Sequence, residues 1–136
     1  MIKINTIIID DDELLIMIMK KMLVKSNFYD SPIAFENGEP ALDNLKLNYN
    51  ADEFYVIFLD INMPVMDGWE FLNHASKFVL PTNTLLYIVT SSTDQADIEK
   101  SKHYELVTEF LSKPVYVDKL LKIKDIVAER VSQVES

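Results

Sequence analysis

Short apolar stretches alternate with amphipathic ones along this chain, and this alternation predicts its architecture. Residues 6–9, 54–59 and 85–89 are apolar almost throughout and show no alternation with polar residues. Continuous apolar runs of this length are typical of parallel strands that are buried on both faces. Two further strand candidates are a mixed run at residues 107–111 and a weak one at residues 32–35, whose proline favours a sheet edge.

Helical spacing fills the intervals between these strands. From residue 13 to about 25, and again from 116 to about 134, apolar residues recur every three or four positions and form a stripe. Weaker helical patterns cover residues 39–47, 68–77 and 94–103. Strands therefore alternate with helices, which predicts an α/β fold with a parallel sheet and helices on both of its faces.

Composition narrows the possible functions. The chain has 136 residues and no cysteine, so we expect one domain, residues 1–136, without disulfides or a thiolate metal site. Its 13 Lys and Arg against 22 Asp and Glu give a net charge of −9, which disfavours direct binding to nucleic acid or anionic membranes. No apolar run approaches the roughly 20 residues of a membrane span, and no export signal is evident. We therefore expect a soluble, cytoplasmic protein.

Polar residues whose side chains could take part in catalysis or metal binding follow the predicted strands. Asp10 and Asp11 come after the first strand, Asp60 after the third, Thr90 after the fourth and Lys113 after the fifth. In an open α/β sheet, ligands bind outside the carboxyl ends of the strands. We therefore expect three carboxylates, a hydroxyl and an ammonium group to meet at one edge of the sheet.

This combination of groups is suited to phosphoryl transfer. Clustered carboxylates repel one another unless a cation neutralises them, and hard oxygen ligands without His or Cys favour Mg²⁺. Lys113 and Thr90 could contact phosphoryl oxygens, in a reaction that depends on positioning and charge neutralisation. The only kind of nucleophile at the centre is a carboxylate, so the product would be an aspartyl phosphate.

Each feature also has a purely structural explanation when it is taken alone. The acidic run 10–13 could cap a helix, Asp60 and Asn62 could form a turn, residues 90–93 could start a helix, and Pro114 could be the first residue of one. The acidic pair could also be placed one residue later, at Asp11 and Asp12. We choose Asp10 and Asp11 because the apolar strand ends directly before them. The coincidence of all features at strand ends favours the functional interpretation.

The arrangement resembles the receiver domain of two-component response regulators, the family of the chemotaxis receiver protein. The resemblance covers essentially the whole chain. It depends on the acidic pair Asp10-Asp11, the D-x-x-M-P-x-x-D-G stretch from Asp60 to Gly68, Thr90, and Lys113-Pro114. It implies a doubly wound, flavodoxin-like (βα)5 fold with strand order 2-1-3-4-5 and a cis bond before the proline.

The resemblance also implies roles for the polar residues. Asp60 would accept a phosphoryl group from a phosphohistidine of a sensor histidine kinase or a histidine phosphotransfer protein. Asp11 and Asp60 would bind Mg²⁺ by side chain, Asn62 by its backbone carbonyl, and Asp10 through a water. Lys113 would pair with the phosphorylated carboxylate.

A second group of residues would transmit the signal. Thr90 would move toward the phosphoryl group, which the backbone at Asn62 and Ser91 would also bind. Phe110 matches the aromatic switch position and would remodel the surface of helix four, strand five and helix five for a downstream protein. Two departures from the family pattern are Phe110 instead of Tyr and Val115 where an aromatic residue is commoner.

We therefore expect a signalling phosphoacceptor and not an enzyme that turns over an external substrate. The length leaves no room for an output domain, which favours a stand-alone regulator, monomeric or dimerising on phosphorylation; a receiver cut from a longer protein would have the same sequence. A haloacid-dehalogenase-type phosphatase would need a general acid at Asn62. A degenerate receiver that serves only as an interaction module would lack Asp60, Thr90 or Lys113, and all three are present.

Overall fold

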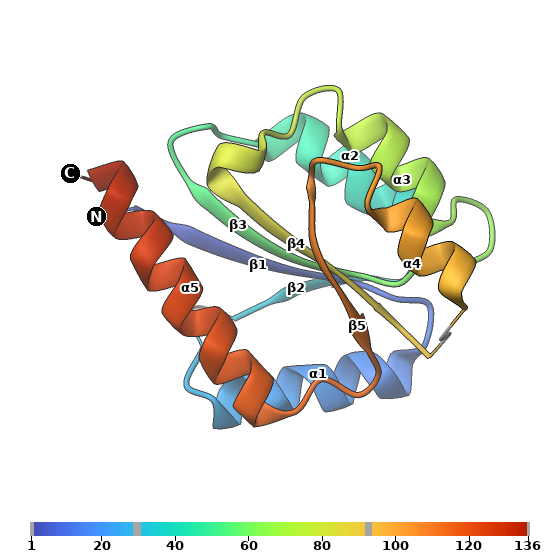
Figure 1. Cartoon of the computed structure of the whole chain (residues 1–136), viewed down its shortest axis with the longest axis horizontal. Helices are drawn as coiled ribbons and strands as arrows, with labels where there is room; N and C mark the ends of the chain where they lie inside the picture. The colour runs from blue at the N-terminus through green and yellow to red at the C-terminus, as the bar shows by residue number, and fades with distance from the viewer. Residues whose placement is uncertain (1, 29–30, 92–93, 136) are drawn as a thin grey trace.

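The computed structural model of the chain describes residues 2–28, 31–91 and 94–135. Its centre is a parallel sheet with the strand order β2-β1-β3-β4-β5, which confirms the predicted fold class (Figure 1). The strands are β1 (Ile4–Ile9), β2 (Ile33–Phe35), β3 (Phe54–Leu59), β4 (Thr84–Thr90) and β5 (Val107–Ser112).

Helices cover both faces of this sheet. Figure 1 shows α1 and α5 on one face and α2, α3 and α4 on the other. The helices are α1 (Glu13–Lys25), α2 (Gly38–Asn48), α3 (Gly68–Ala75), α4 (Gln95–Ser101) and α5 (Val117–Glu135), with a short 3-10 helix η1 (Pro81–Asn83) before β4. Within the described residues, none of these helices combines the length and the apolar character that a bilayer span requires.

The two faces of the sheet explain why the central strands are apolar throughout. All six residues of β3 are buried, and successive side chains point to opposite faces. Ile57 belongs to the core that includes Leu42 of α2 and Phe71 of α3. Phe58 belongs to the second core, which includes residues of α1 and α5. A strand between two cores has no solvent side on which polar residues could alternate.

The ends of several elements differ from the sequence-based expectation. β1 begins at Ile4 rather than Thr6, because Ile4 and Asn5 pair with the first residues of β3 although Asn5 is polar. α4 ends at Ser101 rather than His103. The N–H groups of the next two residues bond to carbonyls three positions back, which tightens the last turn and closes the helix.

Candidate functional site

The three consecutive aspartates after β1 take three different positions. Asp10 is buried, with 6% of its surface exposed, whereas Asp11 is exposed. Asp12 is the N-cap of α1, and its carboxylate accepts hydrogen bonds from the N–H groups of Leu14 and Leu15 at 3.0 and 3.4 Å. Because Asp12 is engaged in capping, the two carboxylates left at the end of β1 are those of Asp10 and Asp11.

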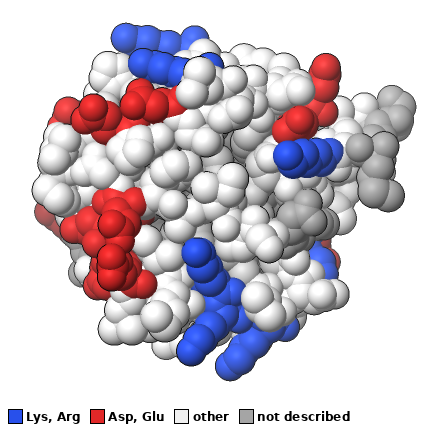
Figure 2. All heavy atoms as spheres, turned by 180° about the vertical axis from the view of Figure 1, so that it is seen from behind, with Lys and Arg blue, Asp and Glu red and all other residues white. Residues whose placement is uncertain are grey.

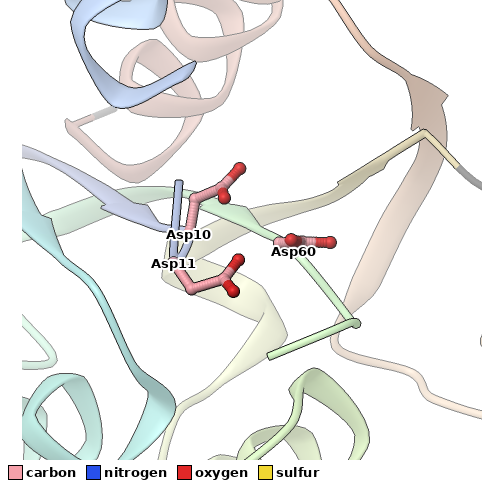
Figure 3. A group of neighbouring side chains, drawn as sticks. All are labelled: Asp10, Asp11 and Asp60. Atoms are coloured by element: carbon pink, nitrogen blue, oxygen red, sulfur yellow. The ribbon is translucent and has the colours of Figure 1, made fainter. Parts of the chain in front are cut away.

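Asp60 completes a cluster of three carboxylates. It follows β3, is 5% exposed, and accepts a hydrogen bond from the N–H of Asn62 at 3.2 Å. One carboxylate oxygen from each of Asp10, Asp11 and Asp60 lies within 4.8 Å of the others, and Figure 3 shows the three side chains side by side at the ends of β1 and β3. The parallel pairing of these two strands, which places Ile9 beside Leu59, brings the next residues together.

Lys113 lies against this cluster from the end of β5. Its Nζ is 2.6 Å from Oδ2 of Asp10 and 3.3 Å from Oδ2 of Asp60, and its side chain is 11% exposed. Its backbone N–H donates to the carbonyl of Thr90 at 2.9 Å, and the following peptide bond to Pro114 is cis, as the resemblance implied. One ammonium group thus faces three carboxylates, which leaves an excess of negative charge.

Burial and neighbouring charges shift the pKa values of this group. Burial raises the pKa of Asp60, and the charge of Asp10 adds to the rise; the charge of Lys113 and the N–H of Asn62 offset it only in part. Burial lowers the pKa of Lys113, but its hydrogen bonds and charge interactions with Asp10 and Asp60 prevail and raise it. Oxygen donors with an excess negative charge fit a hard divalent cation such as Mg²⁺.

The predicted hydroxyl and switch residues lie on the two strands beyond Asp60. Thr90 is 1% exposed and is the last residue of β4, so it lies within the strand and not after it. Ser91 is exposed. Phe110 of β5 is half-buried and packs against the core beneath α2 and α3. Thr90 and Ser91 are therefore at the same sheet edge as Asp60, whereas Phe110 lies within β5 and packs on one face of the sheet.

The loop after β3 contains two features that the sequence analysis missed. A Cβ at Gly68 would lie 2.6 Å from the carbonyl oxygen of Asp60 and from Cα of Ile61, so only glycine fits there. Val65 has φ of 69°, which is an outlier for a β-branched residue, and its side chain is 80% exposed. The scarcity of glycine in this chain, with two in all, was the available signal for Gly68.

Aromatic residues beside this loop connect α3 to α4. Trp69 stacks on Tyr104 with 5.7 Å between ring centroids, and Nζ of Lys100 lies 4.6 Å from the centre of the Trp69 ring. Trp69 is therefore packed against residues on and after α4, which are distant from it in the sequence. His74 and His103 are exposed and have no place among the clustered residues.

The comparison with known families agrees with this geometry. A sequence profile described as the response regulator receiver domain matches residues 6–125. The chain belongs to this family. Receiver domains are signalling phosphoacceptors that interact with histidine kinases or phosphotransfer proteins, and the family resemblance inferred from the strand-end residues is confirmed.

Solved structures show the same fold. A two-component response regulator from Cytophaga hutchinsonii is 23% identical and has a TM-score of 0.83. The match covers 95% of this chain and 99% of that structure. A response regulator receiver protein from Dyadobacter fermentans is 26% identical and has a TM-score of 0.81. Here the match covers 92% of this chain and 98% of that structure. These receiver structures match the chain over nearly its whole length.

A curated relative is a longer protein. The protein-glutamate methylesterase/protein-glutamine glutaminase of Methanococcoides burtonii is 28% identical over 130 residues, which are 94% of this chain and 35% of the relative. Across the curated relatives that it matches, the chain spans 17 to 36% of their length. Their similarity therefore concerns the receiver portion.

Proposed function

We propose that this receiver domain accepts a phosphoryl group on Asp60, in a Mg²⁺-dependent reaction, from the phosphohistidine of a histidine kinase or phosphotransfer protein. The observation that carries the proposal is the position of the Asp60 carboxylate. It is buried, it lies 3.3 Å from Nζ of Lys113, and it belongs to a cluster with two further carboxylates. Asp10 has the same neighbours, so the choice of Asp60 as the acceptor rests on its place at the start of the D-x-x-M-P-x-x-D-G stretch by which the chain resembles the receiver family.

The residues that would hold Mg²⁺ are those around this cluster. Asp11 and Asp60 would bind it by side chain, Asn62 by its backbone carbonyl, and Asp10 through a water. The bound ion would neutralise the carboxylates and the phosphoryl oxygens. The excess of negative charge beside a single lysine supports this assignment, because it gives the site a reason to prefer a divalent cation.

The chain's own groups would orient the reacting carboxylate. Oδ1 of Asp60 accepts from the N–H of Asn62, and Oδ2 accepts from Lys113, so both oxygens are held in place. One of them would form the bond to phosphorus while the phosphorus–nitrogen bond of the donor breaks and its electron pair returns to the imidazole. The Thr90 hydroxyl and the backbone at Asn62 and Ser91 would bind the phosphoryl oxygens.

The output of this reaction would be a change of surface. Thr90 would move toward the phosphoryl group, Phe110 would turn inward, and the surface of α4, β5 and α5 would contact a downstream protein. The half-buried position of Phe110 supports this role, since its ring is neither fixed in the core nor free in solvent. The domain would thus act in cytoplasmic signalling, as a monomer or as a phosphorylation-dependent dimer, and not as an enzyme on an external substrate.

Intact mass spectrometry after incubation with acetyl phosphate and Mg²⁺ tests the proposal. We expect the parent chain to gain one phosphoryl group that is labile to hydroxylamine. The Asp60→Asn variant and a sample with EDTA should gain none. Asp67→Asn is the matched control, because Asp67 caps α3 at the surface and should not affect the gain. Phosphorylation that persists in Asp60→Asn would overturn the assignment. So would a parent chain that gains no phosphoryl group from either acetyl phosphate or phosphoramidate.

A further inference from the structure

The loop from β3 to α3 contains a residue in an unfavourable backbone conformation. Val65 has φ of 69°, in the left-handed region that β-branched residues rarely adopt. Its side chain is 80% exposed, so burial of the side chain does not compensate for the strain. Such a conformation persists only where the surrounding structure holds the backbone in place. The contacts of the two residues that flank Val65 are therefore important for the shape of this loop.

Both flanking residues contact the start of α2. The side-chain amide of Asn37 donates a hydrogen bond to the carbonyl of Pro64, which belongs to the peptide group directly before Val65. Gly38 lies against the residue after Val65, because a Cβ at Gly38 would be 3.0 Å from the carbonyl oxygen of Met66. The start of α2 thus holds the loop immediately before and immediately after the strained residue.

The side chain of Asn37 makes two separate contacts. Its oxygen accepts a hydrogen bond from the N–H of Glu39 at 3.0 Å and caps α2, while its nitrogen donates to Pro64. Capping requires only the oxygen, and serine caps helices about as well as asparagine. The cap of α2 therefore accounts for one half of this side chain, and the contact with the loop is a second function of the same residue.

The segment that carries Asn37 is itself fixed relative to the carboxylate site. The N–H of Asp10 donates to the carbonyl of Phe35 at 3.0 Å, so the end of β2 is bonded to the first residue of the acidic run. Phe35 lies two positions before Asn37 and packs against the core beneath α2 and α3. The loop after β3 is thus held from a frame that includes Asp10.

The same loop begins at the carboxylate site. The N–H of Asn62 donates to Oδ1 of Asp60 at 3.2 Å, and the N–H of Gly68 closes the loop by donating to the carbonyl of Ile61 at 3.1 Å. Within this closed loop, Pro64 fixes its own φ and restricts the residue before it. Because the loop is short and stiff, a movement of the peptide group after Pro64 is transmitted to Asn62.

We propose that Asn37 is a positioning residue of the carboxylate site. By holding the carbonyl of Pro64, it keeps Asn62 where its backbone carbonyl can bind Mg²⁺ beside Asp60. The inference rests on the proposed function, because it takes the carboxylate cluster to be a Mg²⁺ site. It goes further in making the affinity of that site depend on the start of α2, which supplies none of the ligands.

A substitution at Asn37 separates its two contacts. Asn37→Ser keeps an oxygen that caps α2 but lacks the amide that bonds to Pro64, so the free energy of unfolding in EDTA should change little. Hydrogen exchange in EDTA, followed by NMR, should be about tenfold faster at the N–H groups of Asn62 and Gly68, because the loop opens more often. Titration calorimetry should show about tenfold weaker Mg²⁺ binding, as is typical where a group that orients a metal ligand is lost.

A second substitution tests whether Asn37 acts through the strained peptide. Val65→Asn introduces a residue that adopts a positive φ more readily, so the loop depends less on outside contacts. Val65→Asn alone should bind Mg²⁺ at least as tightly as the parent chain. Combined with Asn37→Ser, it should restore most of the lost affinity. A loss of affinity that arose from the cap of α2 would not be recovered by a change at Val65.

Asn48→Ser in the same helix is the matched control. Asn48 is exposed and its amide donates to the carbonyl of Asn44 at 3.1 Å, so this change removes the same kind of bond away from the loop. All of these substitutions exchange one neutral side chain for another. Neutrality is needed because the net charge is −9 and Figure 2 shows Asp and Glu side chains in groups on the surface, so a new charge would itself alter the attraction of a cation.

Four results would overturn the inference. Unchanged hydrogen exchange at Asn62 in Asn37→Ser would show that the loop does not depend on Asn37, and unchanged Mg²⁺ affinity would show that the dependence does not reach the metal. Equal losses in Asn37→Ser and Asn48→Ser, or a double variant as weak as Asn37→Ser, would exclude the strained peptide as the route. A failure of the proposed function is distinct from these, because the parent chain itself would then bind no Mg²⁺, and both proposals would fall together.

Discussion

At the scale of single residues, some buried polar groups of the described residues are paired, whereas the hydroxyls of Thr6, Thr84 and Tyr87 have no hydrogen-bond partner there. Asp10, Asp60 and Lys113 are buried together and pair with one another. Tyr87, at 0% exposure in β4, stacks on Phe58 with 5.8 Å between ring centroids, but its hydroxyl has no hydrogen-bond partner within the described residues. A buried hydroxyl without a partner has a desolvation cost that no contact offsets.

Replacing Tyr87 with phenylalanine should therefore stabilise the protein. The change removes the hydroxyl and keeps the ring, and we expect the free energy of unfolding at pH 7 to rise by about 1 kcal/mol. Urea unfolding followed by circular dichroism measures this difference. Tyr116→Phe is the control, because Tyr116 is 62% exposed and its hydroxyl is not buried. A loss of stability in Tyr87→Phe would show that the Tyr87 hydroxyl makes a stabilising hydrogen bond.

The same residue predicts a dependence on alkaline pH. Burial, with a smaller contribution from the charge of Glu109, raises the pKa of Tyr87 to about 12, whereas a tyrosine in an unfolded chain titrates near ~10. Between these values the unfolded chain loses its proton first, so stability is present below the unfolded pKa and declines as pH rises toward the folded one. Tyr87→Phe should lose less stability than the parent over this interval.

At the scale of elements, the start of α1 joins structure to function. Spacing alone does not decide which of the three aspartates caps the helix and which two belong to the site, because each residue is a good helix cap and a good metal ligand. In the structure Asp12 caps the helix, while Asp10 and Asp11 belong to the carboxylate cluster. The division depends on where β1 stops pairing with β3, at Ile9.

This division predicts opposite effects for two neighbouring substitutions. Asp12→Ala removes the cap of α1 and should lower the free energy of unfolding by about 1 kcal/mol while the affinity for Mg²⁺ changes little. Asp11→Ala should leave stability in EDTA nearly unchanged and weaken Mg²⁺ binding at least tenfold. Urea unfolding in EDTA and calorimetric Mg²⁺ titration separate the two. If Asp12→Ala weakened Mg²⁺ binding and Asp11→Ala lowered stability, the acidic pair of the site would be Asp11 and Asp12 instead.

At the scale of the whole molecule, the site depends on three strands that are distant in sequence. Loops after β1, β3 and β5 supply Asp10, Asp60 and Lys113, so the excess negative charge of the site opposes the packing of the sheet edge. Burial is the main cause of the raised pKa of Asp60, and its charged form is therefore disfavoured in the fold. A cation bound there should stabilise the domain as a unit.

We expect Mg²⁺ to raise the unfolding temperature of the parent chain. A ligand at 100 times its dissociation constant adds about 2.7 kcal/mol, and a comparison with Na⁺ at equal ionic strength removes general screening of the net charge. Asp60→Asn should reduce this gain. In EDTA at pH 7 the same variant should be more stable than the parent, because a raised carboxyl pKa means that stability present at acid pH is lost as pH rises through it.

Much of this protein was determined by its sequence alone. The pattern of apolar residues is a local property, so the bounds of β3 were predicted to the residue, and α1 was predicted to run from Glu13 to about Lys25, where it ends. Parallel topology requires strand ends to meet at one edge, so the gathering of Asp10, Asp60 and Lys113 followed from their positions. The roles proposed for Thr90, Ser91 and Phe110 stay predictions.

Only the tertiary structure decided how the residues at that edge contact one another. It places Lys113 closer to Asp10 than to Asp60, brings Gly68 against the backbone of Asp60, and leaves Val65 with φ of 69°. Such contacts join groups from separate elements, and they depend on distances between packed segments, which no local pattern specifies.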